Sequence, residues 1–190
     1  MAAVKILVIP GSVRESAADV RLAAAIVKEI ALADHEATRI SLADFMLPLH
    51  DDSHGGETPP AALDLKRMVG AHHAVMLVTP ERHALPPPLL LNAMSWLASV
   101  RERSEPALQV VRGRPFAIAS VSDRNDGIYA ALTLRQMLTA GFNADVIAPQ
   151  LIVARGNDAF DRMDRLQDEN EFAAMQNLVR ALIDAAQRMM

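Results

Sequence analysis

The segment IPGSVRESAADVRLA, residues 9–23, carries side chains that could hold an anion. It follows a short apolar run and opens into a helical pattern, and backbone N–H groups at a helix N-terminus attract negative charge. Ser12 could donate a hydroxyl hydrogen bond, and Arg14 could bind a phosphate through two parallel hydrogen bonds. Glu15 and Asp19, however, add two negative charges to the same place. The segment predicts a phosphate loop that is opposed by its own carboxylates.

The alternative is purely structural: Gly11, Ser12 and Ser16 would form only a tight turn and a helix cap. The spacing matches neither the Walker pattern nor the G-x-G-x-x-G of dinucleotide-binding proteins, so it gives no support to an ATP or conventional dinucleotide site. The chain also lacks G-x-S-x-G and H-E-x-x-H, so serine hydrolase and zinc protease chemistry have no motif behind them.

Two further groups of side chains have the types needed for chemistry. Glu81 and His83 could form an acid/base pair in a cleft, or could simply hydrogen-bond within their loop. A polar segment before residue 60 has metal-ligand types, but we interpret it as a solvated loop and predict no metal site. Its four candidate residues are His50, Asp51, Asp52 and His54.

Length, charge and composition limit the class of protein. The chain has 190 residues, which predicts a single domain over 1–190 with its own core. A net charge of -4 argues against a nucleic-acid partner or an acidic membrane surface. The absence of cysteine excludes disulfides and a thiol nucleophile, and the N-terminus reads directly as a strand rather than a leader. We therefore expect a cytoplasmic protein without a membrane-spanning helix.

Strand-like and helix-like patterns alternate along the whole chain. The expected strands are 4–9, 36–42, 73–78, 115–121 and 146–154, the last either one strand or a pair of short ones. The expected helices are 17–33, 60–71, 89–100, 127–140 and a long C-terminal helix whose apolar positions run over 172–186, with 161–171 as its solvated start.

This alternation predicts an α/β protein with a parallel sheet covered on both faces. The commonest five-stranded arrangement is the flavodoxin-like three-layer sandwich, a parallel sheet of order 2-1-3-4-5. Its topological switch lies between the first and third strands. A ligand is therefore expected between the loops 10–17 and 79–86, with the loop 122–127 beside them.

The first loop resembles the G-S-x-R-x-x-S-x-N-x-x-L phosphate loop of the NAD(P)H-dependent FMN reductases, whose relatives include quinone, azo and chromate reductases. Four positions match this motif: Gly11, Ser12, Arg14 and Leu22. Ala17 replaces the second serine of the motif and Asp19 replaces its asparagine. A carboxylate at Asp19 would also suit the first turn of a helix, so it could occupy the place of a phosphate.

The two other loops extend the resemblance over about residues 4–150. The segment 80–96 aligns without gaps to the family's P-E-Y-N-G-S-x-P-G-x-L-K-N-A-x-D-W, and matches at Pro80, Glu81, Pro87, Leu90, Asn92, Ala93 and Trp96. The segment 113–128 resembles G-K-P-x-A-x-x-x-x-S-x-G-x-x-G-G, and matches at Gly113, Pro115, Ala117, Ser122 and Gly127. Departures from these two motifs include Arg82, His83, Ala84, Pro88, Arg124 and Ile128.

The resemblance implies a flavoenzyme in which NAD(P)H passes hydride to FMN and the reduced flavin reduces a quinone-like or other small acceptor. It places the FMN phosphate on Ser12, Arg14 and the N-terminus of the first helix, and the flavin ring against residues 80–83. Ser122 and Gly127 would complete the site from the third loop. The departures predict weakened or lost FMN binding, with Arg21, Arg82 and Arg124 as candidate compensating charges.

Two alternatives remain open at the level of sequence. The chain could be a flavin-free or weakly flavin-binding relative that acts as a binding or structural dimer, or a protein whose cleft takes a different anionic metabolite. The family also implies a homodimer or homotetramer. The residues Met94, Trp96 and Leu97 could serve that interface or could pack in the core.

Overall fold

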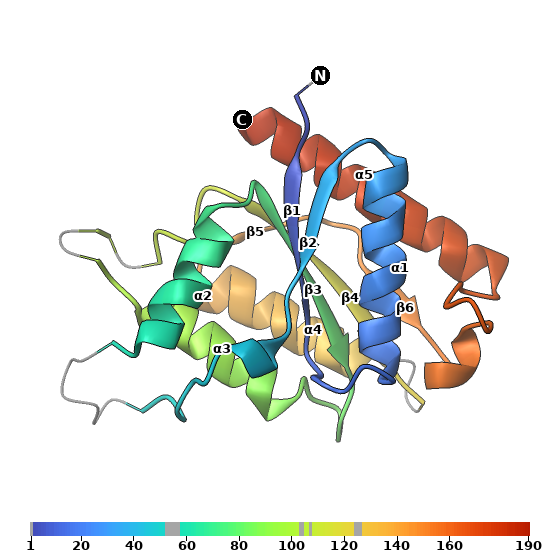
Figure 1. Ribbon diagram of the computed structural model, residues 1–190, viewed down its shortest axis with the longest axis horizontal. Coiled ribbons are helices and arrows are strands. Elements are labelled where there is room, and N and C mark those ends of the chain that lie inside the picture. Colours follow the sequence, from blue (N-terminus) through green and yellow to red (C-terminus); the bar gives the residue numbers. More distant parts are fainter. Residues whose placement is uncertain (1, 52–57, 103–104, 107, 124–126) are drawn as a thin grey trace.

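The computed structural model describes residues 2–51, 58–102, 105–106, 108–123 and 127–190. Strands and helices alternate along the chain (Figure 1). The elements are β1 (Lys5–Pro10), α1 (Ala18–Leu32), β2 (Glu36–Arg39), α2 (Pro60–Gly70), β3 (Ala74–Pro80), α3 (Pro88–Ser99), β4 (Pro115–Val121), α4 (Ile128–Gln136), β5 (Asp145–Val146), β6 (Leu151–Val153) and α5 (Glu169–Met189).

All described strand pairs are parallel, and the order β2-β1-β3-β4-β5 confirms the predicted flavodoxin-like sheet. A sixth strand is attached because the segment 146–154 contains a pair of short strands, the second of the two forms predicted. β5 pairs with the start of β4 at Pro115 and Phe116, and β6 pairs with its end at 119–121. Pro149 lies between β5 and β6 and has no N–H for a continuous ladder.

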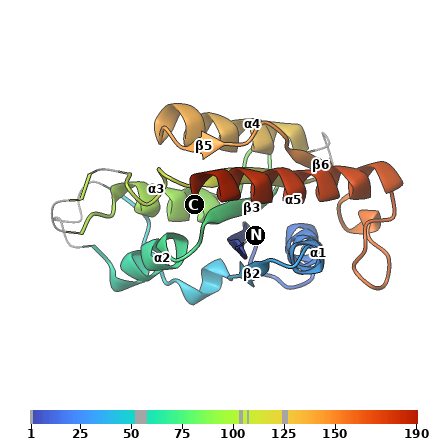
Figure 2. The ribbon, with the colours of Figure 1, turned by 90° about the horizontal axis from the view of Figure 1, so that it is seen from above.

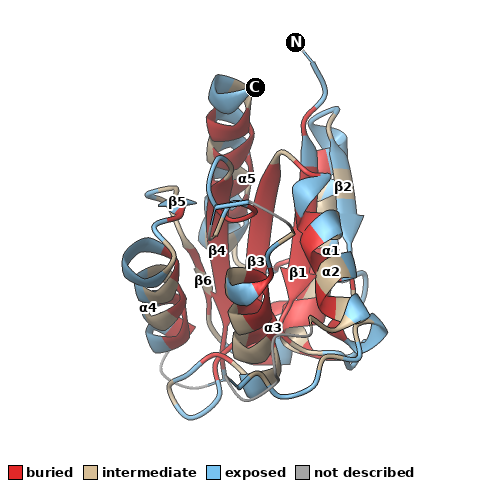
Figure 3. Cartoon of the chain, turned by 90° about the vertical axis from the view of Figure 1, so that its left-hand side faces the viewer, coloured by how far each residue is buried: buried red, intermediate tan, exposed pale blue. Residues whose placement is uncertain are grey.

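The strand side chains alternate between two apolar layers. Ile6 and Val8 of β1 pack with α1 and α5, whereas Leu7 and Ile9 pack with α2, α3 and α4. Figure 2 shows α1 on one side of the sheet and α2 and α3 on the other. The central strands β3 and β4 are buried at every position, and β2 at the edge is mostly exposed (Figure 3). This is the three-layer arrangement expected for a doubly wound sheet.

Three element boundaries differ from the sequence prediction, each for a local reason. β2 ends at Arg39 because the Ser41 hydroxyl accepts the Ala43 N–H and starts a 3-10 turn. α4 ends at Gln136 and continues into a turn of π-helix over 137–141. The predicted helix start over 161–171 was wrong for 161–168, because the Asp168 carboxylate caps α5 and the helix begins one residue later.

Candidate functional site

Three loops meet at the carboxyl ends of β1, β3 and β4, at the lower edge of the sheet in Figure 1. Gly11 is the point of contact between the first two. Its N–H donates to the Val78 carbonyl at 2.8 Å, and an added Cβ would lie 2.9 Å from Pro87 Cγ and 3.1 Å from Pro80 Cδ. A side chain of any size would separate these loops, so the glycine sets how closely they approach.

Asp19 lies inside the first loop rather than on its surface. Its side chain is fully buried, and Oδ2 accepts the Ser12 N–H at 2.7 Å. Oδ1 is also buried and has no hydrogen-bond partner among the described residues. The carboxyl group therefore takes one of the loop N–H groups that a phosphate would use, and leaves one oxygen unsatisfied.

Burial raises the pKa of Asp19 above that of an ordinary aspartate. Hydrogen bonding from Ser12, through its side chain and its backbone, acts in the opposite direction but does not outweigh burial. The positive charge of Arg82 also favours the ionised form. The second loop therefore contributes a cation that acts on the first.

The remaining charges of the first loop point to solvent or to other partners. Arg14 and Glu15 are exposed, and Glu15 pairs with Arg39 at 3.3 Å. Ala17 is the N-cap residue of α1 and provides no side-chain cap, as its replacement of serine predicts. Arg21 does not compensate the loop, since its guanidinium binds Asp164 at 2.6 Å. The third candidate, Arg124, lies outside the described residues.

The second loop keeps a tight hairpin despite its substitutions. Arg82 and Leu85 exchange two backbone hydrogen bonds, of 2.8 and 2.9 Å, around the central residues His83 and Ala84. Both central residues have positive φ, 53° and 63°, which defines a type I′ turn. That turn normally takes Asn-Gly, so the geometry survives with two residues that adopt it at a steric cost.

Glu81 acts as a cap for the helix of the third loop. It is nearly buried, and its carboxylate accepts the Ala130 N–H at 3.0 Å. Gly127 precedes α4 with φ 77° and has no side chain for capping, so Glu81 supplies the missing acceptor from another loop. This contact is the role that the structure shows for Glu81, and Ser122 lies buried beside it at the end of β4.

Residues of the matched motif on α3 hold the segment before α2. Asn92 accepts the His50 N–H at 2.8 Å and donates to the Pro48 carbonyl at 2.9 Å. Trp96 Nε1 donates to the same carbonyl at 2.8 Å, and its ring contacts His50 edge-on. Met94 and Leu97 are buried with Trp96, so all three side chains pack within the chain.

The prediction that residues 50–54 hold no metal is tested only in part, because Asp52 and His54 lie outside the described residues. Within the described part of the chain, no three His, Asp or Glu residues form a group that could hold a metal ion.

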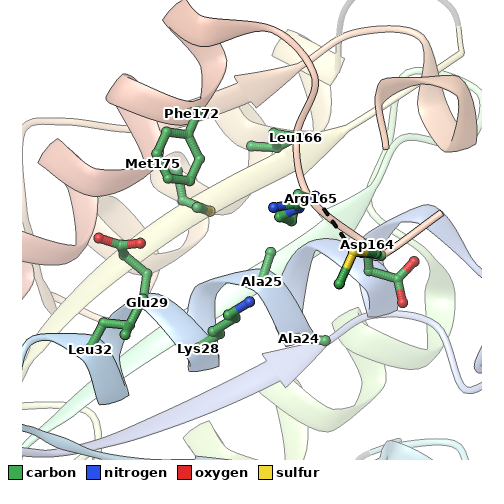
Figure 4. A pocket seen from close by; sticks show the side chains of 11 residues that line it. Ala24, Ala25, Lys28, Glu29, Leu32, Asp164, Arg165, Leu166, Phe172 and Met175 are labelled. Atoms are coloured by element: carbon green, nitrogen blue, oxygen red, sulfur yellow. Dashed lines mark hydrogen bonds between the residues drawn. The ribbon is translucent and has the colours of Figure 1, made fainter. Parts of the chain in front are cut away.

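Two surface hollows border α1 or the loop before it. One of about 370 Å³ borders the first loop on its β2 side and is lined partly by Ser12, Glu15 and Arg39. The other, of about 340 Å³, lies between α1 and α5 (Figure 4). It is mostly apolar, lies away from the three loops and does not border the N-terminus of α1.

Sequence reasoning missed three contacts that join distant segments: Arg21 with Asp164, Glu81 with Ala130, and Asn92 with the segment 48–50. Each joins residues more than 40 positions apart. No sequence periodicity indicates such a contact. The motif matches at Glu81 and Asn92 do identify one residue in each of the last two contacts.

The parallel sheet of order β2-β1-β3-β4-β5, with helices on both faces and three loops converging at the carboxyl ends of its strands, defines a flavodoxin-like protein. The model of the NADPH-dependent FMN reductase family matches residues 4–158. The chain therefore belongs to this family of oxidoreductases, with FMN as cofactor and NAD(P)H as electron donor.

Individual relatives agree with this assignment. An NAD(P)H-dependent FMN reductase of Pseudomonas aeruginosa is 29% identical over 182 residues, which cover 94% of this chain and 93% of the relative. The fold is similar to FerB, a flavoenzyme NAD(P)H:acceptor oxidoreductase from Paracoccus denitrificans, with a TM-score of 0.77, 21% identity, and coverage of 98% and 99%. It is also similar to RosB with a bound riboflavin 5′-phosphate derivative, with a TM-score of 0.76, 12% identity, and coverage of 98% and 80%.

One negative result concerns membranes. None of the helices in the described residues combines the length and the apolar character that crossing a bilayer would require.

Proposed function

We propose that this protein uses NAD(P)H and FMN to reduce a quinone-like or other small electron acceptor. The observation that carries the proposal is the close approach of the first two loops at Gly11. An added Cβ there would lie 2.9 Å from Pro87 Cγ, and the Gly11 N–H donates to the Val78 carbonyl of β3 at 2.8 Å. This contact keeps the anion-binding loop and the tight hairpin of the second loop at one edge of the sheet. FerB, whose fold is similar, is described as an NAD(P)H:acceptor oxidoreductase, which supports an acceptor other than the flavin itself. The quinone-like class rests on the resemblance of the three loops to a family whose relatives include quinone reductases.

The loops have separate roles in this proposal. Ser12, Arg14 and the N-terminus of α1 hold the FMN phosphate, and the segment 80–83 lies against the flavin ring. Ser122 and Gly127 close the site from the third loop. Bound FMN supplies hydride acceptance and donation, so the chain needs no acid or base of its own and contributes placement and electrostatics.

The residues fit the phosphate with one exception. The loop backbone, Ser12 and the helix N-terminus are in place, and Arg14 is exposed beside them. The exception is Asp19, which already binds the Ser12 N–H. Its neutral form is compatible with a phosphate, because a protonated carboxyl can donate a hydrogen bond, whereas its ionised form repels the anion.

The test is a titration of the purified protein with FMN, followed by oxidation of NADH and NADPH in the presence of a soluble quinone. We expect binding with a perturbed visible flavin spectrum, and quinone-dependent NAD(P)H oxidation that requires FMN. Absence of FMN binding by folded protein at acidic and neutral pH would overturn the proposal. It would favour the flavin-free dimer instead.

Two serines of the first loop provide a matched pair of variants. Ser12→Ala removes a donor and should weaken FMN binding about fivefold, which corresponds to about 1 kcal/mol. Ser16→Ala makes the same change at an exposed position of the same loop and should leave the affinity within about twofold. Equal effects of the two changes would contradict the phosphate role of Ser12.

The proposal includes a homodimer or homotetramer in the cytoplasm. The N-terminal part of α4 exposes Ile128, Tyr129 and Leu132, and the second loop exposes Leu85. An apolar patch beside the site is typical of a protein interface. Light scattering should give twice or four times the chain mass, and a monomer would contradict this part of the proposal.

A further inference from the structure

Asp19 lies in the first turn of α1 but turns its side chain into the first loop. Its carboxyl group is fully buried, receives the Ser12 N–H at 2.7 Å, and has a second oxygen without a partner among the described residues. A bound phosphate would meet this group at the same donors. Whether the two can share the loop depends on whether the carboxyl group carries a proton.

We propose that Asp19 couples FMN binding to proton uptake: the neutral carboxyl shares the first loop with the FMN phosphate, and the ionised carboxylate excludes it. This inference rests on the proposed function, since it concerns the same site. It makes Asp19 a positioning residue that controls phosphate affinity. Phosphate-free flavin would not be controlled in this way.

The neighbouring charges leave Asp19 as the group that titrates against the phosphate. Arg82 on the second loop is the cation that acts on it. Glu81 on that loop is bound to the Ala130 N–H, and Arg21 on α1 is bound to Asp164. The other charged or titratable side chains of the two loops are exposed, namely Arg14 and Glu15 on the first and His83 on the second, as is Arg39 beside the first loop.

The sign of the proton linkage follows from burial. Because burial raises the pKa of Asp19, the neutral form persists in the folded protein at pH values where an ordinary aspartate is ionised. Above that raised pKa, binding a phosphate requires one proton to be taken up. The wild-type dissociation constant for FMN should then increase with pH, with a limiting slope of about tenfold per pH unit.

The experiment compares FMN binding by wild type, Asp19→Asn and Glu15→Gln from about pH 5 to about pH 9 by flavin fluorescence. Asp19→Asn retains an acceptor for the Ser12 N–H but cannot ionise. It should bind FMN at least about tenfold more tightly than wild type at the alkaline end, with the difference narrowing as the pH falls. Glu15→Gln removes the same charge from an exposed position of the loop and should follow the wild-type profile.

Two controls separate Asp19 from the ligand. The FMN phosphate itself titrates at about pH 6, but this affects wild type and Asp19→Asn equally. The ratio of their dissociation constants therefore reports only the effect of Asp19 ionisation. Riboflavin lacks the phosphate, and its binding should differ less than about twofold between wild type and Asp19→Asn at every pH. A large pH-dependent difference with riboflavin would overturn the proposal.

A second measurement requires no flavin. Between the ordinary aspartate pKa and the raised one, the unfolded chain releases a proton that the folded chain keeps, so the stability of apo wild type falls as pH rises. Asp19→Asn should lack this decrease, as judged by urea unfolding. Parallel stability profiles or parallel FMN profiles would overturn the inference alone, whereas absence of FMN binding by both folded proteins would overturn the proposed function.

Discussion

The first and second loops depart from their family's motifs in different ways. In the second loop, His83 and Ala84 replace the Asn-Gly that a type I′ turn favours, yet the hairpin closes with both backbone hydrogen bonds. In the first loop, Asp19 keeps the size of asparagine but changes its charge, and it binds the loop N–H that a phosphate needs. The substitutions in the second loop therefore strain its backbone, whereas the substitution in the first loop changes its charge.

This difference shows which kind of substitution a binding site tolerates. Backbone strain lowers the free energy of unfolding of the whole domain, and a loss of about 1 kcal/mol leaves the local geometry unchanged. A buried charge acts directly on the ligand that it faces, because the surrounding medium screens it poorly. We therefore expect the second loop to affect stability and the first to affect affinity.

The largest expected effect on stability is at Gly11, where the two loops touch. Gly11→Ala would bring a Cβ within 2.9 Å of Pro87 and 3.1 Å of Pro80, two rings that cannot rotate away. We expect a loss of about 2–3 kcal/mol in the free energy of unfolding in urea. Gly70→Ala is the matched control, since no atom lies within 4 Å of its added Cβ, and it should not destabilise the protein. Equal losses would mean that the contact at Gly11 is unimportant.

A smaller effect is expected at Glu81, which belongs to the second loop but caps α4. Glu81→Ala leaves the Ala130 N–H without its acceptor and should lower stability by about 1.5 kcal/mol. Glu81→Gln retains an acceptor oxygen and should lose about 0.5 kcal/mol or less. Thermal or urea unfolding of both variants measures the difference. Identical losses would show that the carboxylate charge, rather than the hydrogen bond, stabilises the helix.

The smallest effect is a gain at Ala84. Its φ of 63° is strained for alanine and free for glycine, so Ala84→Gly should raise stability by about 0.5 kcal/mol after the entropy of the unfolded chain is counted. Ala71→Gly provides the control, because its φ of -78° suits alanine and glycine there should lower stability. A loss at Ala84 would contradict the proposal that the hairpin stores strain.

The sequence was sufficient for most of the fold because the signals are local. Alternating apolar runs and helical patterns predicted the strands and helices, and the commonest doubly wound arrangement then gave the correct strand order. The division of 146–154 into two short strands was one of the two predicted forms. The start of α5 was missed because the Asp168 cap depends on where the preceding loop turns, and that loop is set by the pairing of Phe160 with Leu166.

The site was predicted less completely, since its contacts join segments that are distant in sequence. Ser12 and Asp19 are seven residues apart, and their proximity follows from a turn into a helix. The capping role of Glu81, by contrast, depends on α4 beginning 47 residues later, which composition alone does not indicate. The burial of Asp19 is likewise a property of the assembled loops, and it decides the direction of its pKa shift.

The contacts of Arg21 have a consequence for the order in which the molecule is assembled. Its guanidinium binds Asp164, the Asn157 and Asp161 carbonyls, and lies 4.8 Å from the Phe160 ring. Arg21 and Asp164 are 143 residues apart, so this anchor of α1 forms only after most of the chain has been synthesised. The first loop is therefore synthesised early, whereas the helix that follows it gains its last contacts only when the segment 157–164 has been made.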